Sequence, residues 1–300
     1  MPEETDVFSE HRRLLTGVAY RVLGSVDDAE DVVQEAWLRW SKVDSEQIQD
    51  PRAFLVTTVT RLAIDRLRQA RVHREVYPGT WLPEPVSGEL DAAERAALAD
   101  SVDLALLVVL ETLSPLERAV FVLHEAFEMP FAEIGEIIGR AEPATRQLAK
   151  RARDHVQTRR PRFEVDREGR REMTQRFLAA SIEGDLASLM SLLASDVTLV
   201  ADGGGKARAP MRTIAGADKV ARWLVAISTP KGIGAFLTSV GLPTDCELSF
   251  DIVDVNAAPA AVIYADGHPI NVISVALDDG RIKEIYFVAN PDKLAHVRLS

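Results

Sequence analysis

The sequence predicts a multidomain protein in which two all-α domains are followed by an α+β domain. Apolar residues recur at helical spacing up to about residue 160, whereas short alternating or β-branched runs dominate from about residue 166 onward. Within the helical part, three prolines and a glycine in the stretch YPGTWLPEP exclude a helix and predict a linker. We therefore expect helical domains over 1–75 and 100–160, a linker over 76–99 and an α+β domain over 166–300.

The composition is that of a folded protein, and the sequence predicts neither a membrane-spanning segment nor an internal disulfide. The chain has 300 residues, of which 47% are hydrophobic and 27% charged, so it can form buried cores. A single cysteine, Cys246, cannot form an internal disulfide, which fits a reducing cytoplasm, and its surroundings predict a small core residue on a strand. The N-terminus lacks a secretory pattern, and the longest apolar run, 104–110, is too short to cross a bilayer.

Positive charge is confined to two segments of an acidic chain, whose formal net charge is −11. Residues 52–74 carry six arginines and one aspartate, and residues 140–162 carry eight basic and two acidic residues. Residues 75–120 between them carry nine acidic residues and two arginines. Two basic patches on separate modules predict two DNA contacts, which the acidic connector would screen when the protein is idle.

The first domain contains an amphipathic helix that begins after a Ser25 cap. Its apolar stripe recurs at helical spacing and consists of Ala29, Val32, Val33, Ala36, Trp37 and Trp40. The opposite face is acidic and carries Asp28, Asp31, Gln34 and Glu35. DNA would repel this face, so the two interpretations are a basic protein partner and plain exposure to solvent.

A second long helix runs from Pro51 to about Val72. Its inward stripe consists of Val56, Val59, Ala63, Leu67 and Ala70. Another side presents hydroxyls among cations, namely Thr57, Thr58, Arg61, Asp65, Arg68 and Arg71. Such a face suits phosphates and exposed bases, and the scarcity of acids disfavours the alternative of salt-bridged surface arginines.

The second domain contains a helix-turn-helix over 131–153, preceded by a helix that Ser114 and Glu117 start with a capping box. The turn is expected at 139–141. The second helix carries polar and basic residues that suit base edges and phosphates, namely Thr145, Arg146, Gln147, Lys150, Arg151 and Arg153. A solvated basic helix is the alternative interpretation.

The C-terminal domain is expected to pack helices over 168–182, 185–194 and 216–228 against a curved antiparallel sheet. The predicted strands are 197–200, 246–253, 260–264, 270–277 and 281–288, with a hairpin turn at 278–280. Three consecutive glycines lie between Asp202 and Lys206, where they allow positive φ and close backbone approach. A dock for the linker or the C-terminal tail is the favoured interpretation of this loop; an active-site rim and a strained hairpin are the others. His268 is expected at a surface turn.

Three stretches resemble the sigma-70 family, specifically alternative sigma factors of the extracytoplasmic-function (ECF) type. They are DDAEDVVQEAWLRW, PRAFLVTTVTRLAIDRLRQAR and LSPLERAVFVLHEAFEMPFAEIGEIIGRAEPATRQLAKRAR. The remainder resembles a SnoaL-like domain, a cone-shaped α+β fold. The fused subgroup is marked by WLPEP, DGGGK and NPDKL, which occur here at 81–85, 202–206 and 290–294. The resemblance therefore covers almost the whole chain.

The resemblance implies a role for each surface. The acidic helix face with Asp28, Asp31, Gln34 and Glu35, and Trp37 beside it, would bind the clamp helices of core RNA polymerase. The basic face of 51–72, the −10 face below, would meet the −10 element and hold a flipped base. The helix 142–153, the −35 helix below, would read the −35 element.

The resemblance also implies that the C-terminal domain acts in place of a separate anti-sigma factor. It would do so through contacts with the linker and the first helical domain. The residues assigned to these contacts are Trp81, Asp202, Gly203, Gly204, Gly205, Lys206, Asn290, Pro291, Asp292, Lys293 and Leu294.

The predicted function is therefore a cytoplasmic sigma subunit whose partners are core RNA polymerase and promoter DNA. It is expected to be no enzyme, to need neither cofactor nor metal, and to have no membrane partner; a small apolar ligand of the cone cavity is left open. The rivals are a free-standing DNA-binding regulator and an enzyme acting on a small apolar substrate. Two departures from the subgroup are Ala141 in place of a serine N-cap, and YPGT where the linker usually has tyrosine-valine-glycine-proline.

Overall fold

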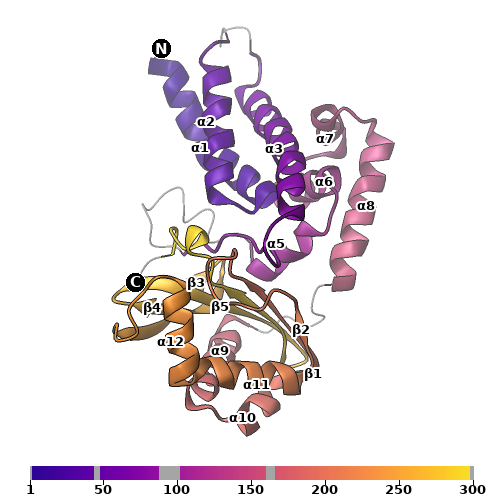
Figure 1. The fold of residues 1–300 in the computed structure, drawn as a ribbon. Helices are drawn as coiled ribbons and strands as arrows, with labels where there is room; N and C mark the ends of the chain where they lie inside the picture. The colour runs from indigo at the N-terminus through magenta and orange to yellow at the C-terminus, as the bar shows by residue number, and fades with distance from the viewer. Residues whose placement is uncertain (1, 44–47, 88–101, 160–165, 298–300) are drawn as a thin grey trace. The chain divides into compact units, whose positions relative to one another are not determined.

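The computed structural model describes residues 2–43, 48–87, 102–159 and 166–297 (Figure 1). The chain divides into two compact units. Among the described residues, the first unit contains 2–43, 48–75 and 106–159, and the second contains 76–87, 102–105 and 166–297. The start of the linker therefore belongs to the C-terminal unit, and not to the helices that it connects.

The first unit begins with three mutually packed helices, α1 (Pro2–Leu23), α2 (Val26–Trp40) and α3 (Pro51–Glu75). As predicted, Ser25 caps α2 by accepting a hydrogen bond of 3.2 Å from the backbone N–H of Asp28. The expected inward stripes of α2 and α3 are buried, apart from the half-buried Trp37 and Ala70. The burial follows from the helical spacing of apolar residues, which puts them on one face.

The unit continues with α5 (Leu104–Glu111), whose first two residues belong to the second unit, and with α6 (Pro115–Glu125), α7 (Phe131–Ile138) and α8 (Glu142–Arg159). The predicted capping box between Ser114 and Glu117 starts α6. Gly139 ends α7 in the left-handed region, at a φ of 66°, which a glycine adopts at no steric cost. The predicted helix-turn-helix over α7 and α8 is therefore confirmed.

A buried arginine joins the two helical segments of this unit. Arg118 of α6 is fully buried, and its Nε donates to the carbonyl of Arg21 at 2.9 Å. Its charge is balanced by Glu111, which also pairs with Arg74 of α3. Since a buried charge is tolerated only when it is paired and hydrogen-bonded, these contacts fix α6 against α1 and α3.

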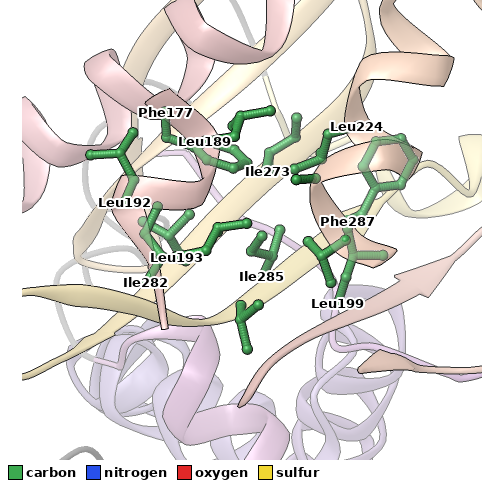
Figure 2. Close-up of a cluster of buried hydrophobic side chains, with 14 of the residues drawn as sticks. Phe177, Leu189, Leu192, Leu193, Leu199, Leu224, Ile273, Ile282, Ile285 and Phe287 are labelled. Atoms are coloured by element: carbon green, nitrogen blue, oxygen red, sulfur yellow. The ribbon is translucent and has the colours of Figure 1, made fainter. Parts of the chain in front are cut away.

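The second unit packs helices against a six-stranded sheet. Its helices are α9 (Arg167–Glu183), α10 (Leu186–Leu192), α11 (Ala217–Ser228) and α12 (Pro230–Ser239). The strands are β1 (Leu193–Asp202), β2 (Ile214–Ala215), β3 (Leu248–Val255), β4 (Ala258–Ala265), β5 (His268–Asp278) and β6 (Arg281–Val288), in the order β2-β1-β6-β5-β4-β3. The core lies between the sheet and the helices, where side chains such as Phe177, Leu224, Ile273 and Phe287 meet (Figure 2).

Three expectations for this unit were wrong or incomplete. The sheet is mixed, because β1 and β6 pair in parallel; apolar patterning reports burial and carries no information on strand direction. Helix α12 was not predicted, since its two glycines weaken the helical pattern, yet Thr229 caps it and Pro230 starts it. Cys246 is half-buried in a bend before β3, and not on a strand.

No helix in the described ranges is long and apolar enough to span a bilayer.

The capping box gives a test of the helical unit. Ser114→Ala removes the side chain that accepts from the Glu117 backbone, so we expect a loss of about 1 kcal/mol in the free energy of unfolding. Urea unfolding followed by circular dichroism measures it. Thr158→Ala, at an exposed site near the end of α8, should change stability by less than about 0.5 kcal/mol. Equal effects of the two substitutions would contradict the role of the cap.

Candidate nucleic-acid and linker-docking sites

The two helices of the helix-turn-helix approach closely at Gly135 of α7. A Cβ at this position would lie 2.6 Å from the carbonyl oxygen of Arg140 and 3.2 Å from Oγ1 of Thr145. Thr145 is fully buried at this contact, and its hydroxyl donates to the carbonyl of Ala141 at 3.2 Å. The prediction that Thr145 contacts DNA is therefore wrong. Its helical position places it on the inward stripe of α8 with Leu148 and Ala152.

The other predicted residues of the −35 helix form an exposed polar face. Gln147 and Lys150 are exposed and have no side-chain partner among the described residues. Arg146, Arg151 and Arg153 each pair with a glutamate, namely Glu142 at 2.5 Å, Glu117 at 3.3 Å and Glu125 at 2.6 Å. Exposed pairs of this kind contribute about 0–1 kcal/mol, so phosphates can replace the carboxylates at small cost.

Two arginines of the predicted −10 face bind backbone carbonyls of the second helical segment. The guanidinium of Arg61 donates to the carbonyls of Ile137 at 2.8 Å and Glu136 at 3.1 Å, at the C-terminal end of α7. That end of a helix carries partial negative charge, which favours a cation. Arg71 donates to the carbonyl of Leu113. Both cations are thus occupied within the helical unit.

The rest of the −10 face is less engaged. Thr57 and Thr58 are half-buried, and the Thr58 hydroxyl donates to the carbonyl of Phe54 at 2.8 Å. Asp65 and Arg68 are exposed and pair with each other at 2.9 Å. The structure therefore keeps these residues on one side of α3, where the guanidinium groups of Arg61 and Arg71 donate to protein carbonyls.

The acidic face of α2 has a cationic partner that was not predicted from the sequence. Arg66 of α3 reaches across and donates to Asp28 at 2.8 Å and Asp31 at 3.0 Å. The hydrogen bond to Asp28 is the main reason why the pKa of Arg66 is raised. Arg66 belongs to neither the inward stripe nor the basic stripe of α3, and this separate position was the available signal.

The other predicted polymerase contacts lie on the same helix. Gln34 and Glu35 are exposed, and Glu35 pairs with Arg39 at 2.6 Å. Trp37 is half-buried and packs edge-on against Phe8, with ring centroids 5.0 Å apart. The face therefore combines exposed polar groups with one partly covered aromatic ring.

In the C-terminal unit, the linker is held by the carboxylate of Asp202 at the end of β1. This side chain is fully buried. Its Oδ1 accepts from the hydroxyl of Tyr77 at 2.6 Å, and its Oδ2 accepts from the backbone N–H of Leu82 at 2.8 Å. One carboxylate thus fixes the linker at two points five residues apart.

The NPDKL segment completes the same site. Lys293 is almost fully buried, and its Nζ donates to Asp202 Oδ2 at 2.6 Å and to the carbonyl of Leu82 at 2.5 Å. The ammonium lies 3.9 Å from the ring centroid of Trp81, a cation–π contact. Asn290 donates from Nδ2 to the Tyr77 hydroxyl at 2.9 Å. Linker, loop and tail therefore share one hydrogen-bond network.

The loop glycines are needed for this approach. A Cβ on Gly204 would lie 2.4 Å from the Asn290 side chain, and one on Gly205 would lie 3.0 Å from Pro78. Both glycines also have positive φ, at 60° and 72°. A Cβ on Gly203 would lie 2.4 Å from the carbonyl oxygen of Ala207 within the loop itself.

Two further contacts surround the network. Lys206 and Asp292 form an exposed ion pair at 2.6 Å. Pro291 starts the short helix η2 (Pro291–Lys293), after which Leu294 is buried. The structure thus brings together all the residues predicted for this loop, the WLPEP tryptophan and the tail. The predicted contact with the first helical domain stays a prediction.

Tyr77 was not among the predicted site residues, although two aromatic residues, Tyr77 and Trp81, in a linker that cannot be helical are a signal for docking. Burial raises the pKa of Tyr77, and the hydrogen bond to Asp202 raises it further. The neutral phenol is therefore favoured in the docked state. This contribution to docking is complete below the ordinary tyrosine pKa of about 10 and is lost as the pH rises through the raised value.

The remaining residues singled out in the sequence lie elsewhere. His268 is exposed at the start of β5, as expected. Within the described ranges, no group of three or more His, Cys, Asp or Glu side chains is arranged to hold a metal ion.

Comparison with known proteins identifies relatives over almost the entire chain. The model of sigma-70 region 2 matches residues 7–72, and that of sigma-70 region 4 matches residues 103–156. The ECF RNA polymerase sigma factor SigJ of Mycobacterium tuberculosis (strain ATCC 25618 / H37Rv) is 41% identical over 297 residues, covering 97% of this chain and 93% of that protein. The probable ECF RNA polymerase sigma factor SigI of the same strain is 32% identical over 292 residues, covering 96% and 93%. The crystal structure of SigJ from M. tuberculosis aligns with a TM-score of 0.77 at 38% identity, over 99% of this chain and 100% of that one.

The docking network predicts a large asymmetry between its two ion pairs. Asp202→Asn leaves the Lys293 ammonium buried without a counter-charge, so we expect a loss of about 3–5 kcal/mol in the free energy of unfolding of the C-terminal unit. Adding Lys293→Met should recover part of that loss. Lys206→Met breaks a pair whose side chains are 57% and 61% exposed, and should cost less than about 1 kcal/mol. Urea unfolding followed by tryptophan fluorescence separates these cases; similar losses for Asp202→Asn and Lys206→Met would contradict the assignment.

Proposed function

Because the chain belongs to the ECF sigma factors of the sigma-70 family, we propose that it directs RNA polymerase to a small set of promoters under control of its own C-terminal domain. In this proposal residues 1–75 contact the −10 element and core polymerase, residues 100–160 contact the −35 element, and the SnoaL-like domain over 166–300 regulates them through the linker. A sigma factor is not an enzyme, since the polymerase supplies the chemistry.

The observation that carries the regulatory part is the hold of Asp202 on the linker. The buried carboxylate binds Tyr77 and Leu82, and Lys293 from the tail balances its charge. The linker connects the two promoter-contacting domains. Because the C-terminal domain fixes the path of the linker, it limits how far the two promoter-contacting domains can separate. Regulation in cis then needs no separate anti-sigma factor.

A second observation supports a restrained form of the helical unit. Arg61 and Arg71 bind carbonyls of the second helical segment, and these bonds compete with any contact of the two guanidinium groups with DNA. Promoter binding would exchange these carbonyls for phosphates and bases, and charged phosphates are stronger acceptors for a guanidinium. We propose that polymerase and DNA drive this exchange, in the cytoplasm where both are found.

Transcription of the host's fragmented genomic DNA by purified core polymerase tests the proposal. Addition of the full-length protein should yield new RNA 5′ ends, which define its promoters. Tyr77→Phe and removal of residues 290–300 should each change transcript yield at these promoters at least threefold, with binding to core polymerase unchanged. Lys206→Met is the matched control, because it breaks an exposed ion pair beside the network and leaves the contacts of Asp202 in place. Failure to bind core polymerase would contradict the sigma assignment, and unchanged yields would contradict regulation through the linker.

The −35 helix gives a separate prediction. In holoenzyme, Arg146→Ala should weaken promoter binding by about 1–3 kcal/mol if the guanidinium reads a base, and Lys150→Ala should lower the salt slope by about one if the ammonium binds phosphate. The buried neighbour provides the control: Thr145→Val should leave the promoter sequence preference intact. Salt-dependent fluorescence anisotropy with a labelled promoter fragment measures all three. If both Arg146→Ala and Lys150→Ala bind the promoter with the affinity and salt dependence of the wild-type protein, the prediction that α8 contacts the promoter is contradicted.

A further inference from the structure

The C-terminal unit contains a cavity of about 880 Å³ that is partly open to solvent. This volume lies in the range of about 300–1,000 Å³ that is common for small-molecule sites. Side chains from α9, α11, α12 and the sheet line it, and most of them are apolar, including Leu178, Trp223, Phe236, Ile273 and Phe287. Two of these lining residues, Ile273 and Phe287, are among the side chains in Figure 2.

One buried polar atom in the described lining has no hydrogen-bond partner. Asn271 of β5 is 3% exposed and lies two residues from Ile273, on the same face of the strand. Its Nδ2 donates to the carbonyl of Val288 at 3.0 Å, whereas its Oδ1 is buried without a hydrogen bond. If the Asn271 amide were flipped, its Oδ1 would face the carbonyl oxygen of Val288, and two acceptors cannot form a hydrogen bond. The amide orientation is therefore fixed, and Oδ1 is the atom without a partner. A donor from a ligand would satisfy it.

The mouth of the cavity is cationic and apolar. Arg208 and Lys231 line it, both are exposed, and neither pairs with a carboxylate in the described part of the chain. Among the described residues that line the cavity, none is an aspartate, glutamate or histidine. Leu248 and Phe250 also line it and are unusually exposed for their type, at 40% and 56%. The mouth therefore favours an anionic group attached to an apolar body.

The lining favours binding over turnover. The hydroxyls of Ser181, Ser228 and Thr229 donate to carbonyls of their own segments. Because the described lining offers these hydroxyls neither a carboxylate nor an imidazole, it provides no general base to activate them. A lining of this kind suits a regulatory domain that binds a ligand, and it does not suit catalysis of hydrolysis or isomerisation.

We propose that this cavity binds an amphipathic carboxylate, with the carboxylate at Lys231 and Arg208 and a hydroxyl donating to Asn271 Oδ1. The ligand class is a hydroxylated fatty acid or a molecule of equivalent shape. The proposal rests on the cavity alone and does not depend on how the linker regulates transcription.

Calorimetric titration of the full-length protein tests it, with ω-hydroxy acids of 10 to 16 carbons, the fatty acids and the diols of the same lengths, all below their micellar concentrations. One hydrogen bond to a buried acceptor predicts that the best hydroxy acid binds about fivefold tighter than the matching fatty acid. Asn271→Leu should abolish that difference. Lys231→Gln should weaken the acids about threefold and leave the diols unchanged, whereas Lys219→Gln, an exposed lysine outside the lining, should change neither.

Three results would overturn the proposal. One is that none of the acids binds. Another is that they bind equally well to Ala235→Trp, which fills the cavity. If Asn271→Leu or Ala235→Trp fails to fold, the affinities of the wild-type protein for the hydroxy acids, fatty acids and diols test the proposal. The third is equal affinity for the hydroxy acid, the fatty acid and an alkyltrimethylammonium ion of the same length, which would exclude both the Asn271 contact and the cationic mouth.

Discussion

The arrangement of the C-terminal unit depends on one buried carboxylate. A fully buried Asp202 would carry a large desolvation cost if it were unpaired, and within the described ranges its cationic partner is Lys293 of the tail. Two further donors to the carboxylate come from Tyr77 and Leu82, which belong to the linker. The linker is therefore part of the electrostatic balance of this domain. Release of the linker would remove the donors Tyr77 and Leu82 from the buried Asp202 carboxylate. Because these hydrogen bonds share one acceptor group, docking of the linker is favoured and cooperative.

The helical unit is restrained by cations that bind carbonyl groups. Arg118 is committed to this role by complete burial, whereas Arg61 is exposed and binds the end of α7 at the surface. The two contacts differ in what competes with them. Water and phosphate cannot reach Arg118, but both can reach Arg61. The surface contact is therefore the one that DNA can displace, and the buried contact holds the segments together until larger changes occur.

Sequence patterns predicted the parts of this structure that depend on interactions between residues close together in the chain. Helical stripes, the Ser114 capping box and the turn at Gly139 depend on neighbours within one or two turns, and all were confirmed. The WLPEP, DGGGK and NPDKL segments were expected to meet because the family resemblance groups them. What failed depends on tertiary packing. Thr145 looked like part of a polar face, but its position opposite Gly135 buries it, and no local pattern reports which strand pairs in parallel with β1.

The cavity and the docking network are joined through the end of β6. Asn271 donates to the carbonyl of Val288, and the next two backbone N–H groups, of Ala289 and Asn290, donate to the carbonyl of Asp202 at 2.8 and 2.9 Å. A ligand that fixes Asn271 would therefore act on the strand end that positions Asn290 against Tyr77. By linkage, a ligand that binds more tightly when the linker is docked must strengthen docking by the same factor. The proposed ligand site and the linker dock are thus separated by only a few residues of backbone.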